Sequence, residues 1–201
     1  MNLAERVHQA WIRARRTRVL CGHVSSLLPS GATVLDVGCG DGTLAAQVLD
    51  VRGDVDVSGV DVLVRSDAAI PVKSFDGRTI PHANRSFDTT LLIDVLHHSE
   101  DPEALLAEAA RVSRTWVILT DHIVRGPLSS RLLRLMDDVG NRRFGVALRY
   151  DYWSEPRWHE TFERLELRVE TWIPKLALYP PPLDWVFGGS LHFVARLAVA
   201  P

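Results

Sequence analysis

Apolar and polar positions alternate with the period of a helix in the first 30 residues of the chain. Apolar side chains recur there three or four residues apart, as they do on the buried face of an amphipathic helix. Two helices are predicted in this region, one over 3–14 and a shorter one over 20–27 that ends at Pro29. The arginines between them suit a solvated helix face better than a patch for phosphate or lipid.

From Thr33 onward, short apolar runs alternate with helical patterns. The predicted helices of this region are 43–49 and 102–112, and the second begins with Asp101 as N-cap and Pro102 at the first helical position. Alternation of this kind indicates a mostly parallel sheet with helices on both faces. The predicted strands are 33–37, 55–60, 71–75, 89–95 and 116–120.

The last third of the chain has a different pattern. It contains a predicted helix over 128–139, a second helix capped by Ser154, and two alternating segments, 167–173 and 191–199. A proline-rich loop joins the last two, so we expect an antiparallel pair. The whole pattern predicts a doubly wound, Rossmann-like α/β sheet of seven strands, six of them parallel. The last strand should be antiparallel and inserted beside the fifth.

The composition excludes several classes of protein. The chain has 201 residues, 46% of them hydrophobic and 24% charged, which is ordinary for a globular domain. A net charge of −2 gives no basic field that would attract nucleic acid or an anionic membrane. The two cysteines, Cys21 and Cys39, lack a disulfide spacing, and neither a secretory signal nor a membrane-spanning run is evident. We therefore expect a cytoplasmic protein without nucleic-acid partners or membrane insertion.

The most informative segment is Val34–Gly42, a buried strand that runs into a glycine turn. Glycines at spacing two let the backbone approach a ligand closely, and a doubly wound sheet binds its ligand at this end of the strands. The dinucleotide fingerprint is broken, because Thr43 stands at its third position. Asp36 would repel a pyrophosphate but attract an ammonium or a sulfonium group. A cationic ligand is therefore favoured over a dinucleotide.

Five segments, in this order, resemble those of the class I S-adenosylmethionine (SAM)-dependent methyltransferases, especially the group that includes ubiquinone-pathway enzymes. The similarity covers about 33–119 and implies methyl transfer from SAM, with S-adenosylhomocysteine (SAH) as product. Because the chain has no evident docking module for RNA or protein, we expect a small-molecule acceptor, whose methylated atom could be oxygen, nitrogen or carbon. The segments are Val34–Gly42, Gly59–Val62, Phe75–Pro81, Ser86–Asp88 and Leu92–His98.

The resemblance also implies a set of cofactor-binding residues. Asp36 would support the ammonium of the methionine part, Asp61 would bind both ribose hydroxyls, and Val62 would lie against the adenine. Asp76, with the amide of Gly77, would bind the adenine's polar edge. Capping of the helix that follows is the alternative role for Asp61 and Asp76. The remaining predicted contacts are the glycine turn, Gly38, Cys39, Gly40 and Gly42, and Asp94 at the carboxyl end of the fourth strand.

Candidates for proton transfer follow the fourth and fifth strands. We expect His122 to accept a proton from the acceptor, with His98 as a second candidate, and Asp121 to point away from His122. Asp94, His97 and His98 match the segment that holds a divalent cation in some quinone-pathway O-methyltransferases. Histidine in place of glutamate makes such a site softer, so no metal is expected. Residues 150–153 form an aromatic group that would wall the acceptor pocket or pack in the core.

These elements predict a single domain over 1–201. The N-terminal helices would occupy 1–30, the SAM-binding core 31–120, and the acceptor elements with the closing strands 121–201. Two other functions remain open: a non-catalytic SAM- or SAH-binding module that partners another enzyme, and an NAD(P) oxidoreductase. The sequence leaves the oligomeric state open.

Overall fold

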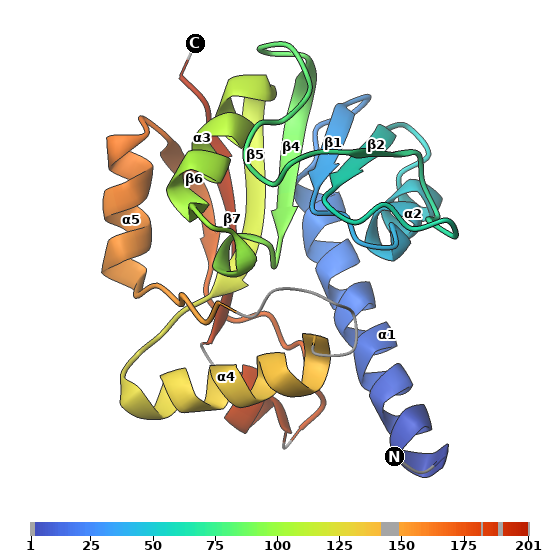
Figure 1. Cartoon of the computed structure of the whole chain (residues 1–201), viewed down its shortest axis with the longest axis vertical. Helices are drawn as coiled ribbons and strands as arrows, with labels where there is room; N and C mark the ends of the chain where they lie inside the picture. The colour runs from blue at the N-terminus through green and yellow to red at the C-terminus, as the bar shows by residue number, and fades with distance from the viewer. Residues whose placement is uncertain (1–2, 142–148, 182, 189–190, 201) are drawn as a thin grey trace.

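A seven-stranded sheet runs through the molecule in the order β3-β2-β1-β4-β5-β7-β6 (Figure 1). This computed structural model describes residues 3–141, 149–181, 183–188 and 191–200. The strands are β1 (Thr33–Val37), β2 (Asp56–Asp61), β3 (Val72–Ser74), β4 (Phe87–Ile93), β5 (Ser113–His122), β6 (Arg168–Ile173) and β7 (His192–Ala198).

Helices cover both faces of this sheet. One group of buried apolar side chains joins α1 and α2 to the sheet, and another joins α3 and α5 to the opposite face. Helix α4 lies across the end at which β4 and β5 finish (Figure 1). The helices are α1 (Leu3–Leu27), α2 (Thr43–Val51), α3 (Pro102–Val112), α4 (Pro127–Asn141), α5 (Glu155–Arg164), and the short turns η1 (Leu96–His98) and η3 (Asp184–Gly188).

The strand directions confirm the predicted doubly wound sheet. Strands β1 to β5 pair in parallel, whereas β7 is antiparallel to both β5 and β6. The connection from β6 to β7 contains only the short turn η3 among its described residues, so β7 returns against its neighbour instead of crossing over. This insertion places the first residue of β7, His192, directly opposite the last residue of β5, His122.

Local capping signals are also confirmed. The Asp101 side chain accepts a hydrogen bond from the amide of Ala104 at the start of α3, and Ser154 accepts one from Arg157 at the start of α5. Trp158 of α5 is buried and donates its indole N–H to the carbonyl oxygen of His122, at 3.0 Å. Helix α5 therefore braces the end of β5, where the chain leaves the sheet.

Several predicted bounds are wrong. Strand β5 runs from Ser113 to His122, whereas the predicted strand was 116–120. The N-terminal region is one continuous helix rather than two, because the arginines between the two apolar stretches are good helix formers and no glycine or proline interrupts them. Strand β4 begins and ends two residues earlier than the predicted 89–95. It stops because Asp94 adopts a left-handed backbone, with φ of 57°, that a strand does not continue. No described helix is long and apolar enough to cross a membrane.

Gly59 of β2 packs closely against Cys39 of the glycine turn, and substitution of this glycine tests the packing. A Cβ atom added at Gly59 would lie 2.4 Å from the sulfur of Cys39, whereas one added at Gly53 would meet nothing within 4 Å. We expect Gly59→Ala to lower the free energy of unfolding by about 1–3 kcal/mol because the site is overpacked. Gly53→Ala should change it by less than about 0.5 kcal/mol. Urea unfolding measures both, and equal effects would contradict the packing described here.

Candidate functional site

The glycine turn after β1 adopts a backbone that requires glycine. Gly38, Gly40 and Gly42 have φ of 70°, 60° and 73°, in the left-handed region that side chains disfavour. A Cβ at Gly38 would also lie 2.7 Å from Val95, whereas the space beside Gly40 is open. The amide of Gly38 donates to the carbonyl of Val60 at 2.8 Å, which fixes the turn to β2. The backbone at Gly40 is thereby presented to a ligand.

Asp61 connects this turn to the end of β2. Its side chain is buried, and Oδ2 accepts a hydrogen bond from the amide of Gly40 at 2.7 Å while Oδ1 accepts one from Leu63 at 2.8 Å. The carboxylate therefore holds the chain's own turns and does not cap a helix. Each oxygen of an ionised carboxylate has two lone pairs, so acceptor capacity remains for hydroxyl groups of a ligand.

Asp36 lies beside Asp61 in the middle of the sheet. It pairs in register with Gly59 of β2 and Leu91 of β4, and only 3% of its surface is exposed. Burial, together with the charge of Asp61, raises the pKa of Asp36 to about 7. Two neighbouring carboxyls of this kind are stabilised by a cation, which an ammonium group can provide. Burial also raises the pKa of the Cys39 thiol, which keeps it protonated and unreactive.

The predicted adenine end lies at Val62 and Gly77. Val62 is 62% exposed, and a Cβ at Gly77 would come within 3.1 Å of it, so the two segments lie against each other. Asp76 is at the surface, where its Oδ1 accepts hydrogen bonds from the amides of Arg78 and Thr79 at 2.8 and 2.7 Å. These bonds lower the pKa of Asp76 and establish its turn-capping role. Its contact with adenine stays a prediction.

This row of residues fits the chemistry of SAM. Carboxyl groups suited to an ammonium and to hydroxyls, Asp36 and Asp61, lie near the carboxyl ends of the neighbouring strands β1 and β2. An exposed apolar side chain at Val62 comes next, as the flat face of an adenine requires. The left-handed glycine turn supplies bare backbone beside them.

A second polar group lies at the ends of β4 and β5. Arg16 from α1 forms an ion pair of 2.5 Å with Asp94, and the Thr120 hydroxyl donates to the other Asp94 oxygen at 3.1 Å. Burial acts to raise the pKa of Asp94, but Arg16 and the nearby histidines outweigh it and leave the pKa below its ordinary value. Asp94 is thus ionised and held by protein groups, whereas its predicted cofactor contact stays a prediction.

His97 is the buried centre of an ion-pair network. Its Nδ1 lies 2.7 Å from Asp121 and its Nε2 lies 3.8 Å from Asp137, which in turn accepts a 2.6 Å hydrogen bond from the Tyr152 hydroxyl. Burial acts to lower the pKa of His97, but Asp121 and the other carboxylates overcome it and raise the pKa. His97 therefore has a structural role that joins η1, β5 and α4. Sequence reasoning missed Asp137.

His122 is buried rather than open at the end of β5. Its Nδ1 lies 3.3 Å from Nδ1 of His97 and 3.5 Å from Asp121, which also accepts the backbone N–H of His122 at 2.7 Å. The prediction that Asp121 points away from His122 is therefore wrong. The hydrogen bond from the backbone N–H of His122 holds the Asp121 carboxylate beside His122. His98 is half-buried, and its ring centroid lies 4.0 Å from that of His97.

The aromatic segment 150–153 divides between the two predicted roles. The Tyr152 ring lies 5.5 Å from the ring of His122 and so borders the polar group, whereas Trp153 packs on Trp158 in the core. His192 was missed altogether, although it is fully buried beside His122 with ring centroids 4.7 Å apart. The predicted insertion of the last strand beside the fifth could have revealed this contact, because an antiparallel neighbour begins where the fifth strand ends.

Comparison with known proteins adds to this geometry. Residues 11–171 match the family model of the methyltransferase domain. The chain belongs to this methyltransferase domain family. Its relatives include 27-O-demethylrifamycin SV methyltransferase of Amycolatopsis mediterranei, 27% identical over 113 residues, which are 49% of this chain and 41% of that protein. The chain thus spans less than half the length of this relative.

Solved structures agree with the family on the fold. A chain of the Haloferax volcanii complex with the Trm112 methyltransferase activator has a TM-score of 0.70 at 15% identity, with 96% of this chain and 97% of that chain covered. A SAM-dependent methyltransferase from Aquifex aeolicus has a TM-score of 0.58 at 18% identity, with 86% and 85% covered. The family and the fold predicted from the sequence are confirmed.

The raised pKa of Asp36 predicts how cofactor binding to this methyltransferase domain depends on pH. As pH falls through about 7, the carboxyl gains a proton and loses its attraction for an ammonium group. SAH affinity should therefore fall from pH 8 to pH 6, by at most about tenfold per unit below 7. Calorimetry measures this dependence. In Asp36→Asn the affinity should be lower and the dependence lost; a wild-type affinity that stays constant over this range would contradict the role of Asp36.

Proposed function

We propose that the protein transfers a methyl group from SAM to an oxygen atom of a small molecule. The observation that carries this proposal is the pair of buried carboxyls, Asp36 and Asp61, beside a glycine turn. A cationic cofactor with hydroxyl groups matches that pair, whereas the pyrophosphate of NAD would be repelled by it. The rifamycin relative, whose printed name indicates methylation at an oxygen, supports the oxygen acceptor.

In this proposal the cofactor extends along the ends of β1, β2 and β3. Asp36 binds the ammonium group, the backbone from Gly38 to Gly40 borders the methionine part, and Asp61 accepts the ribose hydroxyls. Val62 lies against the adenine. Charged hydrogen bonds of this kind contribute about 1.5–3 kcal/mol each, so Asp61 is the side chain whose loss should weaken binding most clearly.

The acceptor in this proposal binds at the carboxyl ends of β4 and β5. SAM, when bound, supplies a methyl group on a sulfonium that leaves readily, so the chain's contribution is mainly to hold the acceptor in line and keep water out. A hydroxyl acceptor must also lose its proton, and the group formed by Asp94, His97, His98, Asp121 and His122 lies at that end of the sheet. His122 is the side chain we assign to this step.

The elements that would enclose a small molecule come from α1, α4 and the segment before β7. Arg16 of α1 and Tyr152 after α4 both reach this end of the sheet, the first through Asp94 and the second through Asp137. The region predicted to hold the acceptor elements and the closing strands, 121–201, lies in part, at 142–148, 182, 189–190 and 201, outside the described residues. The acceptor is therefore proposed only as a hydroxylated small molecule.

Asp61→Ala tests the cofactor half of the proposal. The variant should bind SAH more weakly by roughly 2–4 kcal/mol, because two charged hydrogen bonds to the ribose are lost. Asp67→Ala is a matched control, since Asp67 is exposed in the loop that follows β2. Calorimetric titration with SAH measures both variants, after urea unfolding has established that each is folded. An Asp61→Ala protein that binds SAH as tightly as wild type would restrict Asp61 to holding the turn.

His122→Ala tests the acceptor half. Turnover should fall by about 10²–10⁴-fold, because the acceptor hydroxyl is no longer deprotonated in position. SAH affinity should change little, since the cofactor contacts come from other strands. The measurement is transfer of labelled methyl from SAM to a panel of hydroxylated small molecules, with His98→Ala as a comparison that tells the two candidate histidines apart. An unchanged kcat, or equal losses of kcat and SAH affinity, would remove His122 from the reaction.

A further inference from the structure

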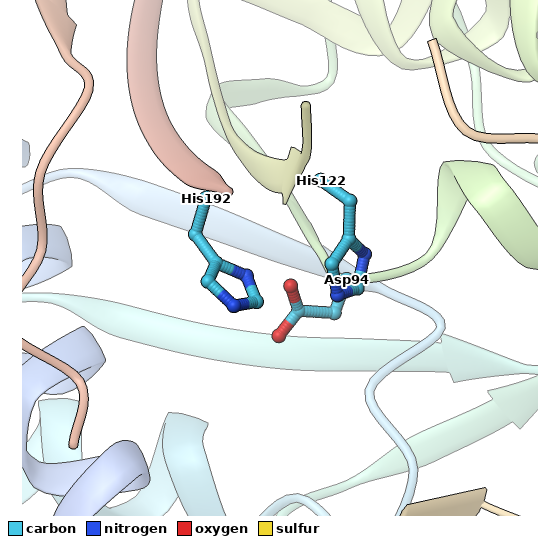
Figure 2. A group of neighbouring side chains, drawn as sticks. All are labelled: Asp94, His122 and His192. Atoms are coloured by element: carbon cyan, nitrogen blue, oxygen red, sulfur yellow. The ribbon is translucent and has the colours of Figure 1, made fainter. Parts of the chain in front are cut away.

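Three side chains that are far apart in the sequence converge at one end of the sheet. Asp94 follows β4, His122 ends β5 and His192 begins β7, and Figure 2 shows the three side chains facing one another. One potential ligand atom from each residue lies within 4.8 Å of those of the other two. The antiparallel pairing of His122 with His192 creates this meeting point.

His192 is the unusual member of this trio. Its surface is 1% exposed, and neither ring nitrogen has a hydrogen bond of normal geometry among the residues that the structure describes; the backbone of Phe187 is near the ring but makes only a weak contact with it. Buried polar atoms in proteins are almost always paired, because leaving one without a partner opposes folding. Figure 2 shows the His192 ring directed at Asp94 and His122. A ligand between the three side chains would give this imidazole its missing partner.

We propose that Asp94, His122 and His192 together bind one divalent transition-metal ion. Two imidazoles and one carboxylate suit Zn²⁺, Fe²⁺ or Co²⁺ better than Mg²⁺ or Ca²⁺, which prefer oxygen ligands. Three protein ligands also leave coordination positions open for a further oxygen. This trio differs from Asp94, His97 and His98, the set matched by the sequence. The potential ligand atoms of His97 group with those of Asp121 and His122, or with those of His98 and Asp137, and not with Asp94.

The surroundings of the trio orient its members as metal ligands require. Nδ1 of His122 faces His97 and Asp121, at 3.3 and 3.5 Å, so Nε2 is the nitrogen that remains for the ion. Thr120 and Arg16 hold the two oxygens of Asp94. Hydrogen bonds of this kind behind metal ligands fix the ring orientation and the carboxylate position.

Arg16 sets an electrostatic limit on the site. Its guanidinium lies 2.5 Å from Asp94 and therefore opposes a cation at the same carboxylate. The carboxylate of Asp121 lies 3.5 Å from Nδ1 of His122 and favours the cation. Removing the Arg16 charge should consequently strengthen metal binding, an effect that general damage to the fold would not produce.

The metal site depends on the side chains alone, whereas its use in the reaction rests on the proposed function. An oxygen bound to a divalent ion has a lowered pKa, so an acceptor hydroxyl in an open coordination position would ionise near neutral pH. His122 would then serve as a ligand, and its removal would impair turnover for that reason.

Co²⁺ is the probe for this proposal, because its d–d absorption reports coordination directly. Tag-free, chelator-treated protein should bind one Co²⁺ per chain and develop visible absorption. His192→Gln and Asp94→Asn should weaken binding by more than about tenfold. His82→Gln, which removes a histidine at a distance from the trio, should not change it. Arg16→Gln should bind Co²⁺ more tightly than wild type.

Wild-type protein that binds SAH but shows no saturable Co²⁺ binding would overturn the metal site and leave the proposed function intact. Equal Co²⁺ affinity of His192→Gln and wild type would overturn it too. If His192→Gln does not fold, X-ray absorption of the zinc-loaded wild type decides the question. Two imidazoles with oxygen ligands support the site, and a sulfur ligand, which only another site could supply, contradicts it. Loss of SAH binding with Co²⁺ binding retained would count against the function alone.

Discussion

One hydrogen bond, from the backbone N–H of Gly40 to the buried carboxylate of Asp61, holds together the part of the molecule that we propose binds the cofactor. That bond joins the left-handed glycine turn after β1 to the end of β2, and the close packing of Gly59 on Cys39 leaves the turn no room to move toward the sheet. Asp36 is enclosed by the same arrangement, which raises its pKa. A cation at the carboxyl ends of β1 and β2 would stabilise both carboxyls, and that constraint is the reason why we propose SAM rather than a dinucleotide.

The acceptor end depends on a different constraint, the antiparallel insertion of β7 between β5 and β6. This pairing brings His192 to His122, and the turn at Asp94 then brings the end of β4 to both. Helix α4 closes the region through Asp137, which Tyr152 and His97 contact. Both regions lie at the carboxyl ends of the parallel strands, so a methyl donor and an acceptor bound there would meet.

The sequence predicted the elements whose signals are local. Strand β1 and helix α3 have the predicted bounds because a buried apolar run and an Asp101-Pro102 start are complete within a few residues. The prediction of two helices in place of α1 is wrong because an arginine-rich stretch is polar, as a loop is, but still favours a helix. The histidine network escaped prediction, since tertiary packing that no short segment encodes brings Asp137 to His97 and His192 to His122.

The central claim is that the site formed by Asp36, Asp61 and the glycine turn binds SAM and its product SAH. Calorimetric titration of the wild-type chain with SAH and, separately, with NAD tests it most directly. The account predicts saturable binding of one SAH per chain and no binding of NAD, because the paired carboxyls favour an ammonium and oppose a pyrophosphate. Binding of NAD without binding of SAH would contradict it.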